Sequence, residues 1–274
     1  MPRVSSRPPY TVVAQFYDQM IGEAMAMNRH ARSKVLGPIL TRARTVCDLG
    51  CGTGSTAIEL AHSGKKVYAV DLSPAMCRMA RRKIHRARLP VKVICADMRR
   101  LRLPEPVDLV LCEFNPLNHL PRKSDLERVA RAVFRSLRPG GYFCFDLNTR
   151  RSLQEQYPST QWIETRNYCV VIHGGFDSRR DKAWLEFEWF IPSDSEGFTT
   201  SSGSSRRKSR RPPTSWRRYR ERLVDTCWSD AEIRRALRCA GFTRIRHWDG
   251  CDVRPPSPHQ RPGYDSYYLA QKKL

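Results

Sequence analysis

Long hydrophobic runs are missing from this sequence of 274 residues. Its longest apolar runs have the length of a β-strand, well short of the roughly 20 residues that a membrane helix needs, so we expect no association with a membrane. The first residues contain no hydrophobic segment of the kind that directs secretion, which predicts a cytoplasmic protein.

Paired cysteine motifs are missing as well, because the ten cysteines form no C-x-x-C pair. Several lie in segments that read as buried strands: Cys47, Cys95, Cys112 and Cys144. A buried free cysteine behaves as a small hydrophobic side chain. We therefore expect a reduced protein with no metal site.

Acidic residues are scarce. The chain has 27 Asp and Glu residues against 49 Lys and Arg residues, which gives a formal net charge of +22. One interpretation is a surface that binds RNA, DNA or an anionic membrane. The other is arginine on the solvated faces of several helices, and the wide spread of the arginines favours it. RNA binding stays open as an alternative.

The most informative stretch is V-C-D-L-G-C-G-T-G, residues 46–54. It indicates a buried strand, a tight turn and the start of a helix. Glycines at 50, 52 and 54 let the backbone adopt positive φ and let a ligand lie against the main chain, at the strand end where open α/β sheets bind nucleotides. Asp48 would repel a phosphate but attract an ammonium group. S-adenosylmethionine fits, since it joins a nucleoside to a free ammonium and has no phosphate.

Further strands are predicted at regular spacing, and most end in an acidic residue: 66–71, 91–98, 107–112 and 142–146. Asp71 follows the glycines by about 20 residues, where the ribose-binding carboxylate of a βαβ nucleotide site belongs. Asp71 and Asp97 should share one edge of the sheet with Asp48, because all three stand at carboxyl ends of predicted strands.

The motifs D-L-G-C-G-T-G, V-D-L-S-P-A-M, A-D-M and L-R-P-G-G occur in this order between residues 46 and 146. In this region the chain resembles class I S-adenosylmethionine-dependent methyltransferases. The resemblance implies an α/β fold with a Rossmann-like, doubly wound sheet of seven strands, the last of them antiparallel. It also implies the cofactor S-adenosyl-L-methionine, with S-adenosyl-L-homocysteine as the product.

The resemblance assigns roles to single residues. Asp71 would hold the ribose hydroxyls, Leu72 and Met76 would pack on the adenine ring, and Asp97 would accept from the adenine amino group while the Met98 amide donates to a ring nitrogen. Asp48 and the glycine backbone would hold the methionine tail. The full set assigned to the donor is Tyr17, Asp48, Gly50, Gly52, Gly54, Asp71, Leu72, Met76, Asp97, Met98, Glu113 and Phe114.

Residues 10–44 are predicted to be helical. Tyr10 and Tyr17 resemble the aromatic residues of an N-terminal helical lid that closes over the methyl donor in many small-molecule methyltransferases. The alternative is that these tyrosines are simply the apolar face of an amphipathic helix.

The loop E-F-N-P-L-N-H-L, residues 113–120, resembles the loop that faces donor and acceptor in bacterial small-molecule methyltransferases. His119 is a candidate general base, because its ordinary pKa lies near neutral pH; a cap for the following helix is the alternative. Asn115 is a candidate acceptor contact. Asn115-Pro116 is also similar to the N-P-P-aromatic motif of enzymes that methylate base amines, but Leu117 replaces the second proline. Our catalytic candidates are His119, Asn115 and Tyr17.

Residues 151–228 interrupt the methyltransferase pattern. Strands are predicted at 168–173, 183–191 and 216–227, and 177–181 reads as a hairpin turn. Such an antiparallel sheet is typical of the same bacterial group and would cover the acceptor pocket. Relatives often carry a histidine where this chain has Leu223, which questions a catalytic role for that strand. Residues 193–215 are rich in Ser and Arg and predict a mobile loop.

The predicted organisation is a disordered tail (1–9), a helical lid (10–44), a donor-binding core (45–150), the inserted sheet (151–228) and a C-terminal helix and hairpin (229–274). The predicted function is methyl transfer to an N or O atom of a small-molecule acceptor. The alternatives are an RNA methyltransferase that uses the basic surface, and a donor-binding protein without turnover.

Overall fold

Two β-sheets organise the chain in the computed structural model, which describes residues 5–193, 215–255 and 261–274. The seven-stranded sheet has the order β11-β12-β6-β5-β2-β3-β4. Its central strands β6, β5, β2, β3 and β4 are parallel, and β12 is antiparallel to both of its neighbours. This confirms the predicted Rossmann-like fold. The bounds are β2 Thr45–Leu49, β3 Lys66–Asp71, β4 Lys92–Cys95, β5 Val107–Cys112, β6 Leu137–Asn148, β11 Phe242–Asp249 and β12 Asp265–Lys272.

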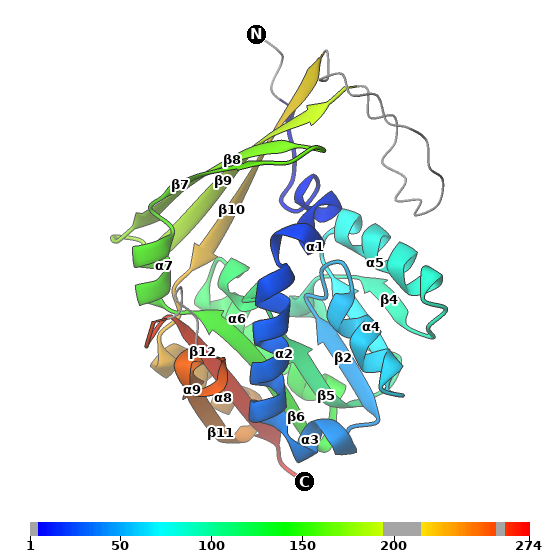
Figure 1. The fold of residues 1–274 in the computed structure, drawn as a ribbon. Coiled ribbons are helices and arrows are strands. Elements are labelled where there is room, and N and C mark those ends of the chain that lie inside the picture. The colour runs from blue at the N-terminus through cyan, green and yellow to red at the C-terminus, as the bar shows by residue number, and fades with distance from the viewer. Residues whose placement is uncertain (1–4, 194–214, 256–260) are drawn as a thin grey trace.

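Helices pack on both faces of this sheet (Figure 1). One core joins the sheet to α6 and α8, and a second joins its other face to α2, α4 and α9. The longer helices are α2 Gly22–Leu36, α4 Ser55–His62, α5 Pro74–Arg86, α6 Lys123–Ser136 and α8 Asp230–Ala240. The short ones are α1 Tyr17–Met20, α3 Pro38–Arg42, α7 Arg150–Gln156, α9 Gly250–Val253, and the 3-10 turns η1 Val13–Gln15, η2 Met98–Arg100 and η3 Pro116–His119. No helix within the described ranges is long and apolar enough to cross a membrane.

The strand interiors explain why the sheet forms here. β2 is buried at every position and β5 at nearly every one, as expected of parallel strands covered on both faces. Cys47, Cys112 and Cys144 are buried, but the expectation for Cys95 is wrong, because β4 is an edge strand and leaves this thiol exposed.

The second sheet has five strands in the order β1-β10-β9-β8-β7 and lies above the carboxyl edge of the first (Figure 1). β8 Cys169–Asp177, β9 Lys182–Pro192 and β10 Trp216–Thr226 match the predicted strands, whereas β7 Thr160–Glu164 was not predicted. Residues 5–9 were expected to be disordered, but Ser5–Ser6 forms β1 beside β10 and the Arg7 amide donates to Arg220. Of the Ser/Arg-rich loop, residues 194–214 lie outside the described residues.

The N-terminal segment joins the two sheets. An aromatic cluster fills the space between η1 and the second sheet, with Phe16 stacked on Trp189 at 5.3 Å between ring centroids and tilted against Tyr168 at 4.3 Å. Glu221 on β10 is 1% exposed, and its carboxylate accepts hydrogen bonds from the amides of Thr11 and Val12 at 2.6 Å and of Val13 at 3.0 Å. One buried carboxylate therefore fixes the segment that precedes α1.

We expect Glu221→Ala to lower the free energy of unfolding by about 2–3 kcal/mol, because it leaves three amides without their charged acceptor. Urea denaturation measures this loss. Glu188→Ala is the matched control: Glu188 lies on β9 and, among the described residues, pairs with the side chains of Arg218 and Arg220, so its loss should cost about 1 kcal/mol or less. Equal losses would contradict the anchoring role.

Candidate active site

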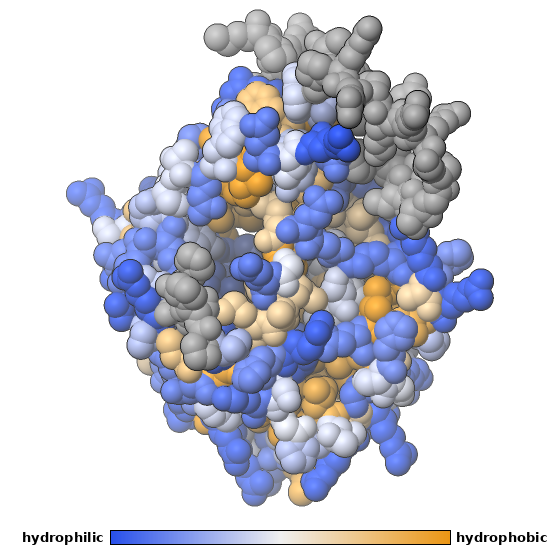
Figure 2. Space-filling model, viewed as in Figure 1, coloured by the Kyte–Doolittle hydropathy of each residue, from blue (hydrophilic) through white to orange (hydrophobic). Residues whose placement is uncertain are grey.

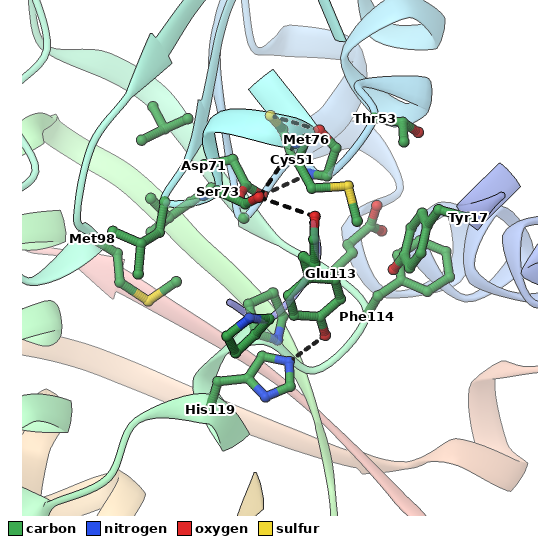
Figure 3. A pocket seen from close by; sticks show the side chains of 18 of the residues that line it. Tyr17, Cys51, Thr53, Asp71, Ser73, Met76, Met98, Glu113, Phe114 and His119 are labelled. Carbon is green, nitrogen blue, oxygen red and sulfur yellow. Dashed lines mark hydrogen bonds between the residues drawn. The ribbon is translucent and has the colours of Figure 1, made fainter. Parts of the chain in front are cut away.

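A cavity of about 550 Å³ lies between the carboxyl edge of the main sheet, the N-terminal segment and β10. In the space-filling view, apolar residues gather around the hollow beneath the inserted sheet, on a surface that is otherwise mostly hydrophilic (Figure 2). Figure 3 shows Met98 and Tyr17 on opposite sides of the cavity, with Asp71 on the upper wall and His119 on the lower. Glu113 and Phe114 lie between them.

The glycine turn after β2 forms one wall. Gly50 has a φ of +76°, and a Cβ there would come within 2.7 Å of Pro116 Cγ, so any larger residue would collide with η3. Gly52 has a φ of +53°, and the ring of Tyr17 lies 3.5 Å from where its Cβ would be. Gly54 begins α4. The turn thus exposes its backbone to the cavity.

Asp71 lies at the end of β3 and orders this turn. Its Oδ2 accepts from the Gly52 amide and its Oδ1 from the Ser73 amide, each at 2.8 Å. A carboxylate has about four acceptor sites, so two remain, which is the number that a ribose diol requires. Nearby, Met76 is 2% exposed while Leu72 is 66% exposed, and both line the cavity.

Asp97 differs from the expectation. Both of its oxygens accept hydrogen bonds from the Arg99 guanidinium, and Oδ1 also accepts from the Arg99 amide. These bonds hold the pKa of Asp97 below its ordinary value. The carboxylate is therefore saturated in this conformation, and an adenine amino group would reach it only after Arg99 moves. Met98 and Arg99 line the cavity beside it.

Asp48 is 3% exposed, and its Oδ2 is buried without a hydrogen-bond partner among the described residues. Burial raises its pKa to about 7, although the positive charge of Arg32 opposes the shift. Glu113 is also buried, with its Oε2 3.0 Å from Arg32 Nη1, and burial raises its pKa to about 8. A cationic ligand would supply the partner that Asp48 lacks, so the ammonium-bearing tail of S-adenosylmethionine fits this wall.

The lid segment is pinned to the glycine turn through Asp18. Its carboxylate accepts from Thr53 Oγ1 at 2.5 Å and from Lys83 Nζ at 2.6 Å. This places Tyr17 over Gly52, and Tyr10 meets Tyr17 edge-on with ring centroids 6.3 Å apart. Both tyrosines face the cavity instead of serving only as the apolar side of a helix.

His119 lies at the far end of the cavity within a chain of polar contacts. Its Nε2 is 2.7 Å from the Tyr10 hydroxyl, and its Nδ1 is 2.6 Å from Asp225 Oδ1. The Tyr157 hydroxyl donates to the other oxygen of Asp225. Burial by itself lowers the pKa of His119, but the adjacent Asp225 carboxylate outweighs it and raises that pKa above 6.5.

Sequence reasoning missed Asp225 and Tyr157. The available signal was the alternation of β10, in which Glu221, Leu223 and Asp225 are all buried and share one face of the strand. Leu223 lines the cavity, and the carboxylate of Asp225 stands two residues further along this strand.

Asn115 does not line the cavity, in contrast to Phe114 and His119. Its Oδ1 is buried without a hydrogen-bond partner among the described residues. Its backbone amide donates to Asp146 Oδ1 at 2.8 Å. The structure thus brings two of our catalytic candidates, His119 and Tyr17, to one cavity, and gives Asn115 a place in the loop behind it.

Comparisons with known proteins show a methyltransferase domain in this chain. Residues 46–141 match the family model described as a methyltransferase domain. YqeM of Bacillus subtilis, which is named as a methyltransferase, is 29% identical over 156 residues, or 57% of this chain and 62% of that protein. A dTDP-4-amino-2,3,4,6-tetradeoxy-D-glucose N,N-dimethyltransferase of Saccharopolyspora spinosa is 32% identical over 102 residues, which is 37% of this chain and 39% of that protein. The chain spans about three fifths of the length of the first curated relatives.

Solved structures share the fold over nearly the whole chain. An S-adenosylmethionine-dependent methyltransferase from Clostridium acetobutylicum superposes with a TM-score of 0.75 at 19% identity, covering 97% of this chain and 99% of that one. The sugar N-methyltransferase KedS8 from Streptoalloteichus superposes with a TM-score of 0.66 at 22% identity, covering 92% and 87%. The domain match and the relatives agree that residues 46–141 form a methyltransferase domain, and the chain shares the fold of S-adenosylmethionine-dependent methyltransferases.

Proposed function

We propose that this protein binds S-adenosylmethionine in the cavity and transfers its methyl group to a nitrogen or oxygen atom of a small-molecule acceptor. One observation carries the proposal. A single cavity connects the unpartnered carboxylate of Asp48 with the His119–Tyr10 pair, so a donor site and an acceptor site share one space.

The donor half is built from the carboxyl ends of β2, β3 and β4. Asp48 and the glycine turn hold the methionine tail, Asp71 holds the ribose hydroxyls, and Leu72 and Met76 cover the adenine. When bound, S-adenosylmethionine supplies an electrophilic methyl group on a sulfonium. Tyr17 closes over the glycine turn and excludes water from this half.

The acceptor half is built from η3, β10 and the N-terminal segment. Neutral His119 has its Nδ1 2.6 Å from Asp225 Oδ1 and 3.5 Å from the Val224 carbonyl oxygen, and its Nε2 accepts from the Tyr10 hydroxyl. An acceptor proton passes to the Tyr10 oxygen as the Tyr10 proton moves to Nε2, and Asp225 stabilises the imidazolium that results. Alignment of acceptor and methyl group supplies much of the remaining rate enhancement.

An amine is the acceptor that the charges favour. Four carboxyl groups line the cavity, those of Asp48, Asp71, Asp97 and Glu113, and Asp225 lies against it. Two arginines line it as well: Arg99 pairs with Asp97, and Arg222 lies over the ring of Trp184. A cavity of this charge attracts an alkylammonium group. His119 can then remove the proton that the nitrogen must lose before it attacks. The names of KedS8 and of the Saccharopolyspora relative, both N-methyltransferases, support the same choice.

RNA methylation is the second candidate, and the basic surface motivates it. Arg78, Arg81 and Arg82 on the exposed face of α5 form no ion pair with another described residue. RNA bound through such a face would lose affinity steeply as salt rises. A donor-binding protein without turnover is the other alternative, and it would bind donor yet methylate nothing across broad acceptor panels.

We expect Asp71→Ala to weaken donor binding by about tenfold to a hundredfold, because two hydrogen bonds to a charged group are lost. Calorimetry with S-adenosylmethionine measures the affinity. Asp252→Ala, on the exposed surface of α9, is the control and should bind as the wild type does. Repeating the titration with a short mixed RNA at low and high salt tests the second candidate. Failure of the wild type to bind donor would refute the main proposal.

Donor affinity should rise with pH from about 6 to about 8. The pKa of Asp48 is about 7, so below this value its carboxyl is largely protonated and cannot pair with the donor's ammonium. Calorimetry across this range checks the slope, and Asp48→Asn, which cannot ionise, should flatten it. A wild-type affinity that is independent of pH would rule out this ion pair. The charged side chains of Arg32, Asp71 and Glu113 face the same site and are unchanged in Asp48→Asn, so the two proteins differ only at position 48.

We expect His119→Ala to lower kcat by about a hundredfold or more once an amine acceptor has been found by screening, while donor affinity stays nearly unchanged. In the wild type, kcat should increase with pH as His119 loses its proton. Asp225→Asn should move that increase to lower pH, because the carboxylate that raises the pKa of His119 is gone. An unchanged pH profile in Asp225→Asn would contradict a base at His119.

A further inference from the structure

The loop after β5 has an unfavourable backbone. Phe114 and Asn115 have positive φ angles of +68° and +61°, and neither is glycine. Such residues persist only where their surroundings hold them. The loop matters because Phe114 lines the cavity and η3, which begins directly after Asn115, carries His119. The contact that holds this backbone therefore controls both halves of the site.

That contact is the carboxyl group of Asp146. This residue lies on β6 and has 0% exposure. Its Oδ1 accepts from the Asn115 amide at 2.8 Å, and the Phe114 amide also favours its charged form. Successive backbone amides in a turn make a concave site for an anion, and here a carboxylate of the same chain is the anion.

The opposite side of Asp146 is anchored as well. Asn28 Nδ2 on α2 donates to Oδ2 at 3.0 Å, and Arg254 Nη2 lies 4.0 Å from the same oxygen. Asn28 Oδ1 in turn accepts from Arg254 at 2.8 Å and from the Tyr267 hydroxyl at 3.0 Å. Asp146 thus joins the loop to α2 and to the C-terminal part of the chain.

We propose that Asp146 is a positioning residue: it holds the strained Phe114–Asn115 turn so that Phe114 faces the donor and His119 faces the acceptor. Asp146 is not among the residues that line the cavity, so it acts through the loop and not by touching a ligand. The donor half of this inference concerns the binding of S-adenosylmethionine, and only the acceptor half rests on the proposed reaction.

Two substitutions separate the roles of Asp146. Asp146→Ala removes both the acceptor for the loop amides and the charge beside Arg254, whereas Asp146→Asn keeps one acceptor oxygen for the loop and loses the charge and the acceptor for Asn28 Nδ2. We expect affinity for S-adenosylhomocysteine, measured by calorimetry, to fall about tenfold in Asp146→Ala but about threefold or less in Asp146→Asn. Equal losses would mean that Asp146 serves only as the counter-charge of Arg254, and would overturn the proposal.

A glycine at position 115 provides an independent readout. Glycine adopts positive φ without steric cost, and the Asn115 side chain it replaces has an unpartnered oxygen. Asn115→Gly in the Asp146→Ala background should therefore restore most of the lost affinity. A double-mutant cycle measures this coupling. Strictly additive losses, with no rescue, would show that Asp146 does not hold the turn.

Asp265→Ala is the matched control. Asp265 on β12 also pairs with Arg254, at 2.5 Å, but forms no hydrogen bond with Phe114 or Asn115. It should keep wild-type affinity, and thermal unfolding confirms that each variant is folded. The titration needs no acceptor, so normal wild-type binding without an effect at Asp146 overturns this inference alone. A wild type that binds no S-adenosylhomocysteine overturns the inference and the proposed function together.

Discussion

Buried carboxylates at the carboxyl ends of parallel strands are the constraint on which the site depends. Asp48, Asp71 and Asp146 lie at or near the carboxyl ends of β2, β3 and β6. Removing such charges from water is costly unless they are paired. Asp71 is satisfied by the glycine turn and Asp146 by the loop after β5. Of the three, Asp48 alone keeps an unpartnered buried oxygen. The unpartnered oxygen of Asp48 therefore marks the place where we propose that the donor's ammonium binds.

The inserted sheet and the N-terminal segment enclose the cavity beside Asp48, and strand β10 connects the two. On a single face of β10, Glu221 binds the lid amides and Asp225 contacts His119. Lid position and histidine orientation are therefore set by the same strand. Excluding water here strengthens every charge interaction inside the cavity. The inserted sheet therefore affects the chemistry of the pocket as well as its shape.

Much of the fold was predictable because its signals are local. Parallel strands covered on both faces appear as short apolar runs, and the turn at 50–54 depends only on glycine geometry. The contact between His119 and Asp225 was not predictable, because it depends on how β10 lies over η3. The hydrogen bond from the Asn115 amide to Asp146 joins residues far apart in the chain, so it was not predictable either. The Arg99–Asp97 contact is local, but the A-D-M motif indicates only a role for the carboxylate and does not include the arginine.

The chain as a whole is strongly basic, whereas four carboxyl groups and two arginines line its cavity, and this difference explains why composition alone was ambiguous. Surface arginines act through solvent, where salt screens them beyond about 8 Å at physiological ionic strength. The cavity carboxylates act over a few ångströms in a space with little water, so a bound ligand responds mainly to them. Asp48 and Asp225 therefore weigh more in selecting a ligand than the formal charge of +22. A basic protein can in this way hold a site for a cationic donor and, as we propose, for an amine acceptor.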